Sequence, residues 1–84
     1  MKATIRGVRY DTDKAILVGG TTHDVGEANP SYWQARLYRQ PRSGRYFLVG
    51  RGGGMTVFAK GERLMPLYLH DAIEWSRWHL SGTL

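Results

Sequence analysis

The segment at residues 32–50 constrains the fold of this chain more than any other, because it is typical of two strands joined by a tight turn. Both halves are rich in residues that favour extended backbone, and the turn Pro41-Arg42-Ser43-Gly44 contains a proline and a glycine. Symmetrical closure of this turn pairs Tyr38 with Phe47. The sequence therefore predicts an antiparallel hairpin whose other pairs are Gln40 with Arg45, Leu37 with Leu48 and Arg36 with Val49.

This register sorts the side chains of the hairpin into two faces, because alternate residues of a strand point to opposite sides of a sheet. Both faces hold apolar side chains, so the sequence leaves open which of them the helix covers. One face carries Trp33, Ala35, Leu37, Arg39, Tyr46 and Leu48, and the other carries Tyr32, Gln34, Arg36, Tyr38, Arg45, Phe47, Val49 and Arg51.

Residues 69–80 have the apolar periodicity of a single α-helix, with one stripe that suits packing on a sheet. Trp75 and Trp78 lie off that stripe, so we expect them outside the packed side of the helix. The stripe consists of Leu69, Ala72, Ile73, Ser76 and Leu80.

The other segments are expected to be strands and loops. Residues 2–9 favour a strand, and residues 15–19 favour a second strand that pairs with the first. Glycines and an Asn-Pro pair predict a long loop at residues 19–31. Two further extended segments are expected at residues 55–59 and 63–67, after a glycine-rich break.

Strands followed by one helix predict an α+β fold, with a small antiparallel β-sheet of about four to five strands and one C-terminal α-helix packed on one face. The 84 residues suffice for a single domain, residues 1–84. The chain has no cysteine, so we expect its thin core to form without disulfide bonds. We also expect a cytoplasmic protein with no signal peptide and no membrane partner, because no apolar run approaches the roughly 18 residues that span a bilayer.

No pattern in the sequence indicates catalysis. The glycine-rich segment 50–54 is followed by Met55-Thr56, where a Walker loop requires a glycine, a lysine and then serine or threonine. His70 and His79 fall on opposite sides of the expected helix, and His23 has no second histidine at ligand spacing. We therefore expect no catalytic residue, no metal site and no cofactor.

Positive charge is concentrated in the middle of the chain. The net charge is +5, and nine of the twelve basic residues are arginines, which make bidentate contacts with phosphate and carboxylate groups. Residues 28–60 contain no acidic side chain. This distribution favours an anionic partner, although the same arginines also suit a solvated face. The basic residues of the segment are Arg36, Arg39, Arg42, Arg45, Arg51 and Lys60.

Two candidate binding surfaces follow from these patterns. Tyr38 and Phe47 alternate with arginines on one face of the hairpin, as in sheets whose rings stack on single-stranded nucleic acid; the alternative is that the rings belong to the core. Trp75 and Trp78 predict a protein interface, and the alternative is packing against the long loop or the sheet edge. The predicted partner-binding residues are Arg36, Tyr38, Arg39, Arg45, Phe47, Arg51, Trp75 and Trp78.

Short motifs along most of the chain resemble a group of small proteins that are common on phages and integrated mobile elements. The group shares a start that here reads Gly7-Val8-Arg9-Tyr10-Asp11-Thr12, and a strand that here reads Leu37-Tyr38-Arg39. It also shares a segment that here reads Phe47-Leu48-Val49-Gly50-Arg51-Gly52-Gly53. The group closes with Pro66-Leu67 before a terminal helix that carries a tryptophan, here Trp75.

Some small proteins similar to this group are anti-CRISPR inhibitors. The resemblance therefore implies a non-catalytic inhibitor that binds a CRISPR effector complex of type I (Cascade) and blocks target DNA. Arg51 stands where the group commonly has an acid, and the chain is basic, so we expect steric blocking or contact with an acidic patch rather than mimicry of DNA. The alternative is a small basic nucleic-acid-binding module that uses the hairpin at residues 32–51. In either case the protein is expected to be a monomer or a homodimer.

Overall fold

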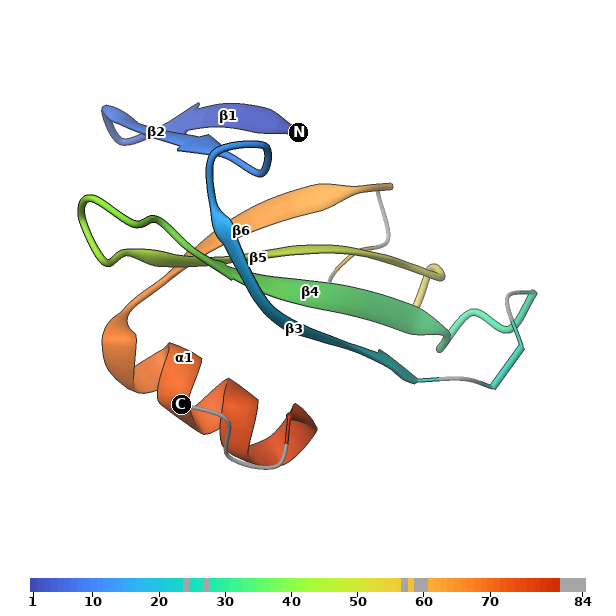
Figure 1. Ribbon diagram of the computed structural model, residues 1–84. Coiled ribbons are helices and arrows are strands. Elements are labelled where there is room, and N and C mark those ends of the chain that lie inside the picture. Colours follow the sequence, from blue (N-terminus) through green and yellow to red (C-terminus); the bar gives the residue numbers. More distant parts are fainter. Residues whose placement is uncertain (24, 27, 57, 59–60, 81–84) are drawn as a thin grey trace.

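The computed structural model describes residues 1–23, 25–26, 28–56, 58 and 61–80. These residues form the predicted α+β fold, with six antiparallel strands in two sheets and one C-terminal helix (Figure 1). The elements are β1 (Lys2–Ile5), β2 (Val8–Asp11), β3 (Ile16–His23), β4 (Trp33–Arg39), β5 (Tyr46–Gly52), β6 (Arg63–Leu67) and α1 (Leu69–His79). Strands β3, β4, β5 and β6 form one sheet in that order, and β1 and β2 form a separate pair, called the N-terminal hairpin below.

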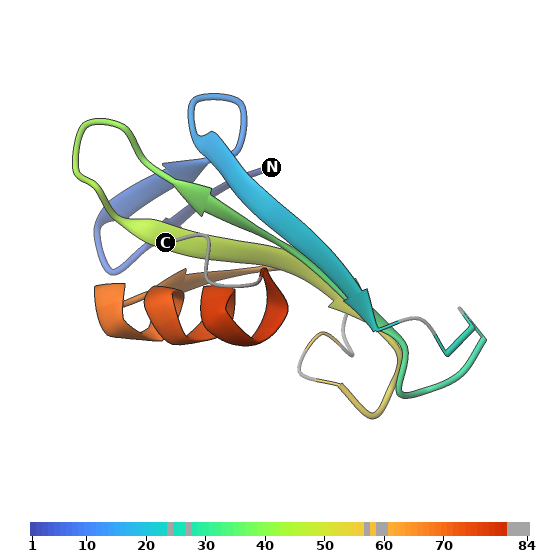
Figure 2. The ribbon, with the colours of Figure 1, turned by 60° about the horizontal axis from the view of Figure 1, so that its bottom comes forward.

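The four-stranded sheet is the middle layer of the protein (Figures 1 and 2). The N-terminal hairpin covers one face and α1 covers the other, and each side has its own cluster of buried side chains. The helix packs on the face that carries Leu37 and Leu48, which answers the question that the sequence leaves open. The cluster under the N-terminal hairpin consists of Tyr10, Tyr38, Phe47, Val49 and Leu64, and the cluster under the helix consists of Ala35, Leu37, Leu48, Phe58 and Ala72.

The hairpin formed by β4 and β5 has the predicted register, with Tyr38 opposite Phe47. Its turn is closed by two backbone hydrogen bonds. The Gln40 N–H donates to the Arg45 carbonyl at 2.8 Å, and the Gly44 N–H donates to the Gln40 carbonyl at 2.9 Å. Gly44 has a φ of +70°, a conformation that glycine adopts without a steric penalty. The turn residues therefore set the register, as the sequence predicts.

The N-terminal segment differs from its prediction. Residues 2–9 are not one strand, because β1 and β2 pair with each other through a two-residue turn at Arg6 and Gly7. The φ angles of these residues are +52° and +77°, and two consecutive positive values are typical of tight turns between antiparallel strands. The single-strand prediction is wrong because the β propensity is continuous and only Gly7 marks the turn.

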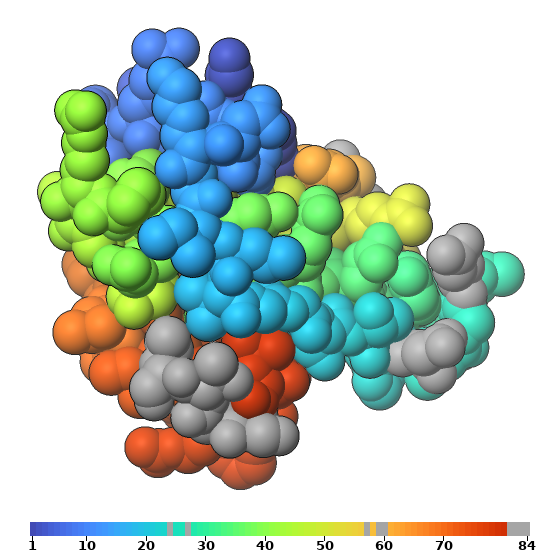
Figure 3. Space-filling model, in the orientation of Figure 1, coloured from blue at the N-terminus to red at the C-terminus, as the bar shows by residue number. Residues whose placement is uncertain are grey.

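Strand β3 is longer than predicted and has a different partner. It pairs with β4 and extends to His23, so the predicted pairing with the first strand and the predicted loop start at residue 19 are both wrong. Gly19 and Gly20 lie inside this strand, where a Cβ on Gly19 would be 3.0 Å from Leu80 Cδ1. The glycines mark a close approach of neighbouring groups rather than a turn. Strand β3 is an edge strand and runs along the surface between the N-terminal hairpin and the helix (Figure 3).

The glycine-rich run joins two loops at one end of the sheet. The Gly53 N–H donates to the Tyr32 carbonyl at 2.7 Å, and the Met55 N–H donates to the Pro30 carbonyl at 2.9 Å. A Cβ on Gly53 would collide with the backbone of Pro30. The run therefore serves a close approach of two backbones, and β5 continues through it to Gly52 instead of ending at residue 50.

The predicted strand at residues 55–59 is wrong for Met55, Thr56 and Phe58, which are not in a strand, while Val57 and Ala59 lie outside the described residues. The Thr56 hydroxyl donates to the Gly53 carbonyl at 2.9 Å and accepts from the Phe58 N–H at 3.2 Å. These local bonds replace strand pairing and direct the Phe58 ring into the core under the helix. The extended segment at 63–67 is confirmed as β6.

The helix lies where it is predicted but packs with a different side. Ala72 and Ser76 are buried, whereas Leu69 is 61% exposed and Ile73 is 36% exposed. The buried Ser76 hydroxyl donates to the Ile73 carbonyl at 2.8 Å, so it has a partner. The predicted stripe is therefore wrong for Leu69 and Ile73. Two small residues let the helix approach the sheet closely and place Trp75 against the core instead.

Candidate binding surfaces

The structure places the predicted partner-binding residues in several different environments, so they do not form one surface. Lys60, which belongs to the acid-free segment, lies outside the described residues. Tyr38 and Phe47 are buried in the sheet. Arg36 and Arg51 are exposed on one face of the sheet, and Arg39 is half-buried on the other face. Arg45 is exposed after the turn, and Trp75 and Trp78 lie on α1.

Tyr38 and Phe47 are part of the core, which corrects the prediction of an exposed ring pair. Their relative exposures are 7% and 0%. The two rings stack with centroids 5.3 Å apart, and the Tyr10 ring contacts Phe47 edge-on at 5.3 Å. The N-terminal hairpin covers the Tyr38 and Phe47 rings. The sequence does not predict this cover, because residues 2–9 are expected to form one strand. Neither ring is available to stack on a base.

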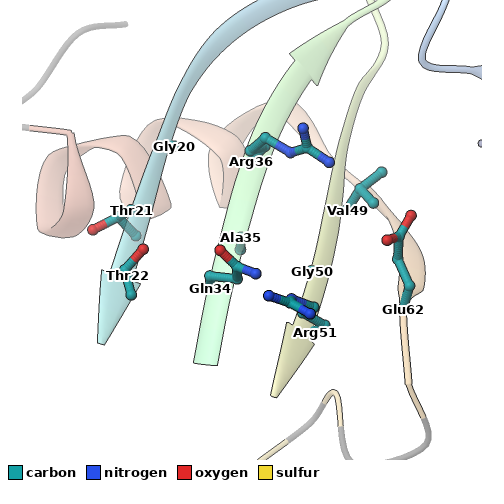
Figure 4. A pocket seen from close by; sticks show the side chains of 10 residues that line it. All are labelled: Gly20, Thr21, Thr22, Gln34, Ala35, Arg36, Val49, Gly50, Arg51 and Glu62. Carbon is teal, nitrogen blue, oxygen red and sulfur yellow. The ribbon is translucent and has the colours of Figure 1, made fainter. Parts of the chain in front are cut away.

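The N-terminal hairpin leaves the other end of the same sheet face uncovered, and a pocket of about 360 Å³ lies there (Figure 4). We call it the sheet-face pocket. Figure 4 shows the side chain of Arg51 on β5 beside Gln34 on β4, with Arg36 farther along β4. The pocket is lined by Gly20, Thr21, Thr22, Gln34, Ala35, Arg36, Val49, Gly50, Arg51 and Glu62.

Polar contacts position the arginines of this pocket. The Gln34 amide, with its oxygen turned toward Arg51, accepts hydrogen bonds from Nη2 at 2.8 Å and from Nε. The Arg36 guanidinium lies over the Tyr38 ring, with Cζ 6.0 Å from the centroid. Gln34 faces Arg51 in the predicted register, so its role is readable from the sequence. Thr22 on β3 and Glu62 just before β6 come from segments whose pairing the sequence does not predict.

A second and larger surface lies on the helix side of the sheet. It is a mainly apolar groove of about 720 Å³ between α1, strand β6 and the loop around residue 56, and we call it the helix groove. Trp78 is 75% exposed and Met55 is 77% exposed, so large apolar side chains reach solvent at its edges. It is lined by His23, Ser31, Trp33, Leu48, Met55, Thr56, Phe58, Met65, Leu67, Asp71, Glu74, Trp75, Trp78 and His79.

Aromatic contacts hold the inner wall of the helix groove. The Trp33 ring stacks on His23 at 6.2 Å and meets His79 edge-on at 5.2 Å. The His79 ring also contacts Trp75 at 4.9 Å. Trp75 is thus half-buried and fixed by neighbours, whereas Trp78 lies beyond this cluster and is largely exposed.

Acidic side chains accompany the tryptophans on the groove side of α1. Asp71 and Glu74 both line the helix groove, although the chain as a whole carries +5. The helical spacing could have indicated this, because Asp71, Glu74, Trp75 and Trp78 fall three or four residues apart and share one side. The two surfaces therefore differ in chemistry: the sheet-face pocket has two arginines and the helix groove is apolar with carboxylates.

Among the residues that the structure describes, no group of three or more His, Cys, Asp or Glu side chains could hold a metal ion. The described residues also include no helix with the length and apolar character needed to cross a membrane.

The comparisons with known proteins identify no relative: no family model, no curated protein and no solved structure matches this chain.

Proposed function

We propose that the chain is a non-catalytic inhibitor from a phage or mobile element that acts in the host cytoplasm. Its target is a CRISPR effector complex of type I (Cascade), which it binds through a protein surface and so keeps from target DNA. The target class comes from the motif resemblance. The observation that supports binding through a protein surface is the helix groove, which is lined by the exposed Trp78.

The helix groove has the composition of a protein-binding site. Tryptophan is enriched among residues that dominate binding energy, and methionine adapts its shape to different partners. Trp78 and Met55 each expose about three quarters of their surface, which a protein this small has no folding reason to leave in water. Asp71 and Glu74 beside the tryptophans favour a partner segment that combines an apolar anchor with lysine or arginine.

Binding of the effector complex through the helix groove, called the groove mode below, predicts that Trp78→Ala abolishes inhibition without unfolding the protein. The measurement is phage plating on a host whose type I CRISPR system targets that phage, with the variant or the parent chain expressed from a plasmid. Loss of an interface hot spot weakens binding by roughly 2 kcal/mol, or about 30-fold. We therefore expect plating to fall at least 10-fold at matched expression.

Tyr68→Ala is the matched control, because Tyr68 is also an exposed aromatic residue, 69% accessible, but does not line the groove. It should inhibit like the parent. Full inhibition by Trp78→Ala would contradict the groove mode. Failure of the parent chain to inhibit or to bind purified effector complex would contradict the proposed target.

A second candidate function is a basic nucleic-acid-binding module that uses the hairpin at residues 32–51. The observation that favours it is the pair of exposed arginines, Arg36 and Arg51, in the sheet-face pocket. With Tyr38 and Phe47 in the core, such a module has no base-stacking platform at these positions and relies on contacts with the phosphate backbone.

A further inference from the structure

We infer that the sheet-face pocket is a binding site for one phosphate group of a nucleic-acid backbone. This inference rests on the second candidate function and gives it a defined site. It does not depend on the helix groove, which lies on the opposite side of the sheet.

Two arginines line the pocket from adjacent strands. Arg36 on β4 faces Val49, and Arg51 on β5 faces Gln34, so the two arginines are diagonal neighbours on one face. Side chains at such positions start roughly 7–8 Å apart, which long side chains bridge easily. Arginine presents a planar fork of donors that matches the oxygen atoms of a phosphate group. Figure 4 shows Arg51 near Gln34 and Arg36 at the next position along β4 on the same face.

Neighbouring groups position the guanidinium groups of Arg36 and Arg51 in the unliganded protein. The Gln34 oxygen accepts from Arg51, so the Gln34 –NH2 donor is turned away from Arg51 and toward β3. Arg36 rests over the Tyr38 ring, which is itself fixed in the core. Side chains that are already ordered lose less conformational entropy on binding, and this favours a site for a small charged group.

The third strand gives the pocket its depth. Gly20 on β3 pairs with Arg36, and a Cβ at this position would lie 3.0 Å from Arg36 Cγ. The absence of a side chain there opens the space that a phosphate group needs beside the Arg36 stem. Thr22, two residues further along β3, lines the same pocket with a hydroxyl donor.

The lining residues favour a phosphate over a neutral ligand or a base. Among the described residues that line the pocket, Arg36 and Arg51 are basic and Glu62 is acidic. The described residues that line it include no aromatic side chain, so a bound strand would be held by its backbone and not by stacking.

The test measures two ligands with one set of variants. Titration with inorganic phosphate, followed by amide NMR, should move the signals of Gly20, Gln34, Arg36 and Arg51 and leave those of α1 in place. Fluorescence anisotropy with a labelled single-stranded 12-mer then reports binding of a backbone. R36Q/R51Q should bind the 12-mer at least 10-fold more weakly, with a salt slope lower by about 0.7 for the one phosphate lost. The matched control, R9Q/R77Q, removes the same charge from exposed sites outside the pocket and outside the hairpin at residues 32–51, and should lose less than 3-fold.

A variant that changes no charge tests the pocket even if the double mutant does not fold. Gly20→Ala keeps every charge, and its added methyl group displaces Arg36, so it should weaken phosphate and 12-mer binding several-fold with little change in Tm. Equal losses in R36Q/R51Q and R9Q/R77Q would overturn the pocket and leave only a net-charge effect. Equal binding of poly-glutamate and the 12-mer would overturn the assignment to phosphate. If the parent chain binds no 12-mer at all, the second candidate function fails as well, whereas the groove mode is judged by the plating assay alone.

Discussion

Trp75 and Trp78 are three residues apart on α1 and have different roles in the structure. Trp75 packs against the cluster under the helix and contacts His79 at 4.9 Å. Trp78 is 75% exposed. The sequence predicts both outside the packed side, and this holds for Trp78 alone, because Ala72 and Ser76 bring Trp75 toward the sheet.

Alanine substitution should separate the two tryptophans by stability. Trp75→Ala removes part of a packed ring, and we expect it to lower the free energy of unfolding by about 2 kcal/mol, less than the roughly 3–5 kcal/mol of a fully buried tryptophan. Trp78→Ala should change it by less than about 0.5 kcal/mol, as exposed sites usually do. Urea unfolding of both variants measures the difference. Equal losses would mean that Trp78 is also packed in solution.

Gly53 lies at a point where the structure leaves no room for a side chain. Because a Cβ there would collide with the Pro30 backbone, we expect Gly53→Ala to cost about 1–3 kcal/mol, the usual range for overpacking. Gly54→Ala is the control, since a Cβ at Gly54 would meet nothing within 4 Å. Thermal unfolding measures the effect, at roughly 4–8 °C per kcal/mol for a domain of this size. A Gly53→Ala protein as stable as the control would mean that the two loops are not in contact.

At the scale of elements, the N-terminal hairpin decides which side chains of the sheet are core. Its attachment to the β4–β5 turn includes a hydrogen bond in which Gln40 Nε2 donates to the Arg9 carbonyl at 2.7 Å. Tyr10 reaches from β2 onto the Phe47 ring. Without this hairpin, Tyr38 and Phe47 would lie on an open face beside Arg36, which is the arrangement that the sequence alone suggests.

The Arg6-Gly7 turn is therefore expected to control access to that core. Gly7→Ala places a Cβ on a residue at φ +77°, which costs roughly 1–2 kcal/mol for an L-residue. Because the hairpin covers only one face, we expect it to open locally before the sheet unfolds. Hydrogen exchange should be faster in β1 and β2 and unchanged in β4 and β5. Uniformly faster exchange would show that the hairpin and the sheet unfold together.

The elements also show what the sequence can and cannot predict. The β4–β5 register is predictable because alternation and a proline–glycine turn agree on it, and α1 is predictable because its periodicity is local. Strand β3 is not predictable in this way, because a Gly19-Gly20 pair in a sequence can mark either a turn or a close approach inside a strand. The side of α1 that packs depends on the sheet beneath it, which is a tertiary contact. The same limit applies to the candidate surfaces, because the cover over Tyr38 and Phe47 comes from a distant part of the chain.

At the scale of the whole molecule, the sheet separates two surfaces of different chemistry. The helix groove combines apolar side chains with Asp71 and Glu74, and the sheet-face pocket combines Arg36 and Arg51. Substitutions that share no contacts usually have additive effects. The plating assay for the groove and the phosphate titration for the pocket therefore test independent properties of one protein.

The position of α1 after all the strands has a consequence for synthesis of the protein. The face of the sheet that carries Leu37 and Leu48 is complete once β6 has been made at Leu67, but its cover ends at His79, 12 residues later. At roughly 5–20 residues per second, a ribosome needs about 0.6–2.4 seconds to add them. The opposite face has no such delay, because the N-terminal hairpin is made first. During every round of translation the nascent chain therefore passes through a state with one side finished and the other bare, and this is when a chaperone or a neighbouring nascent chain meets its apolar surface.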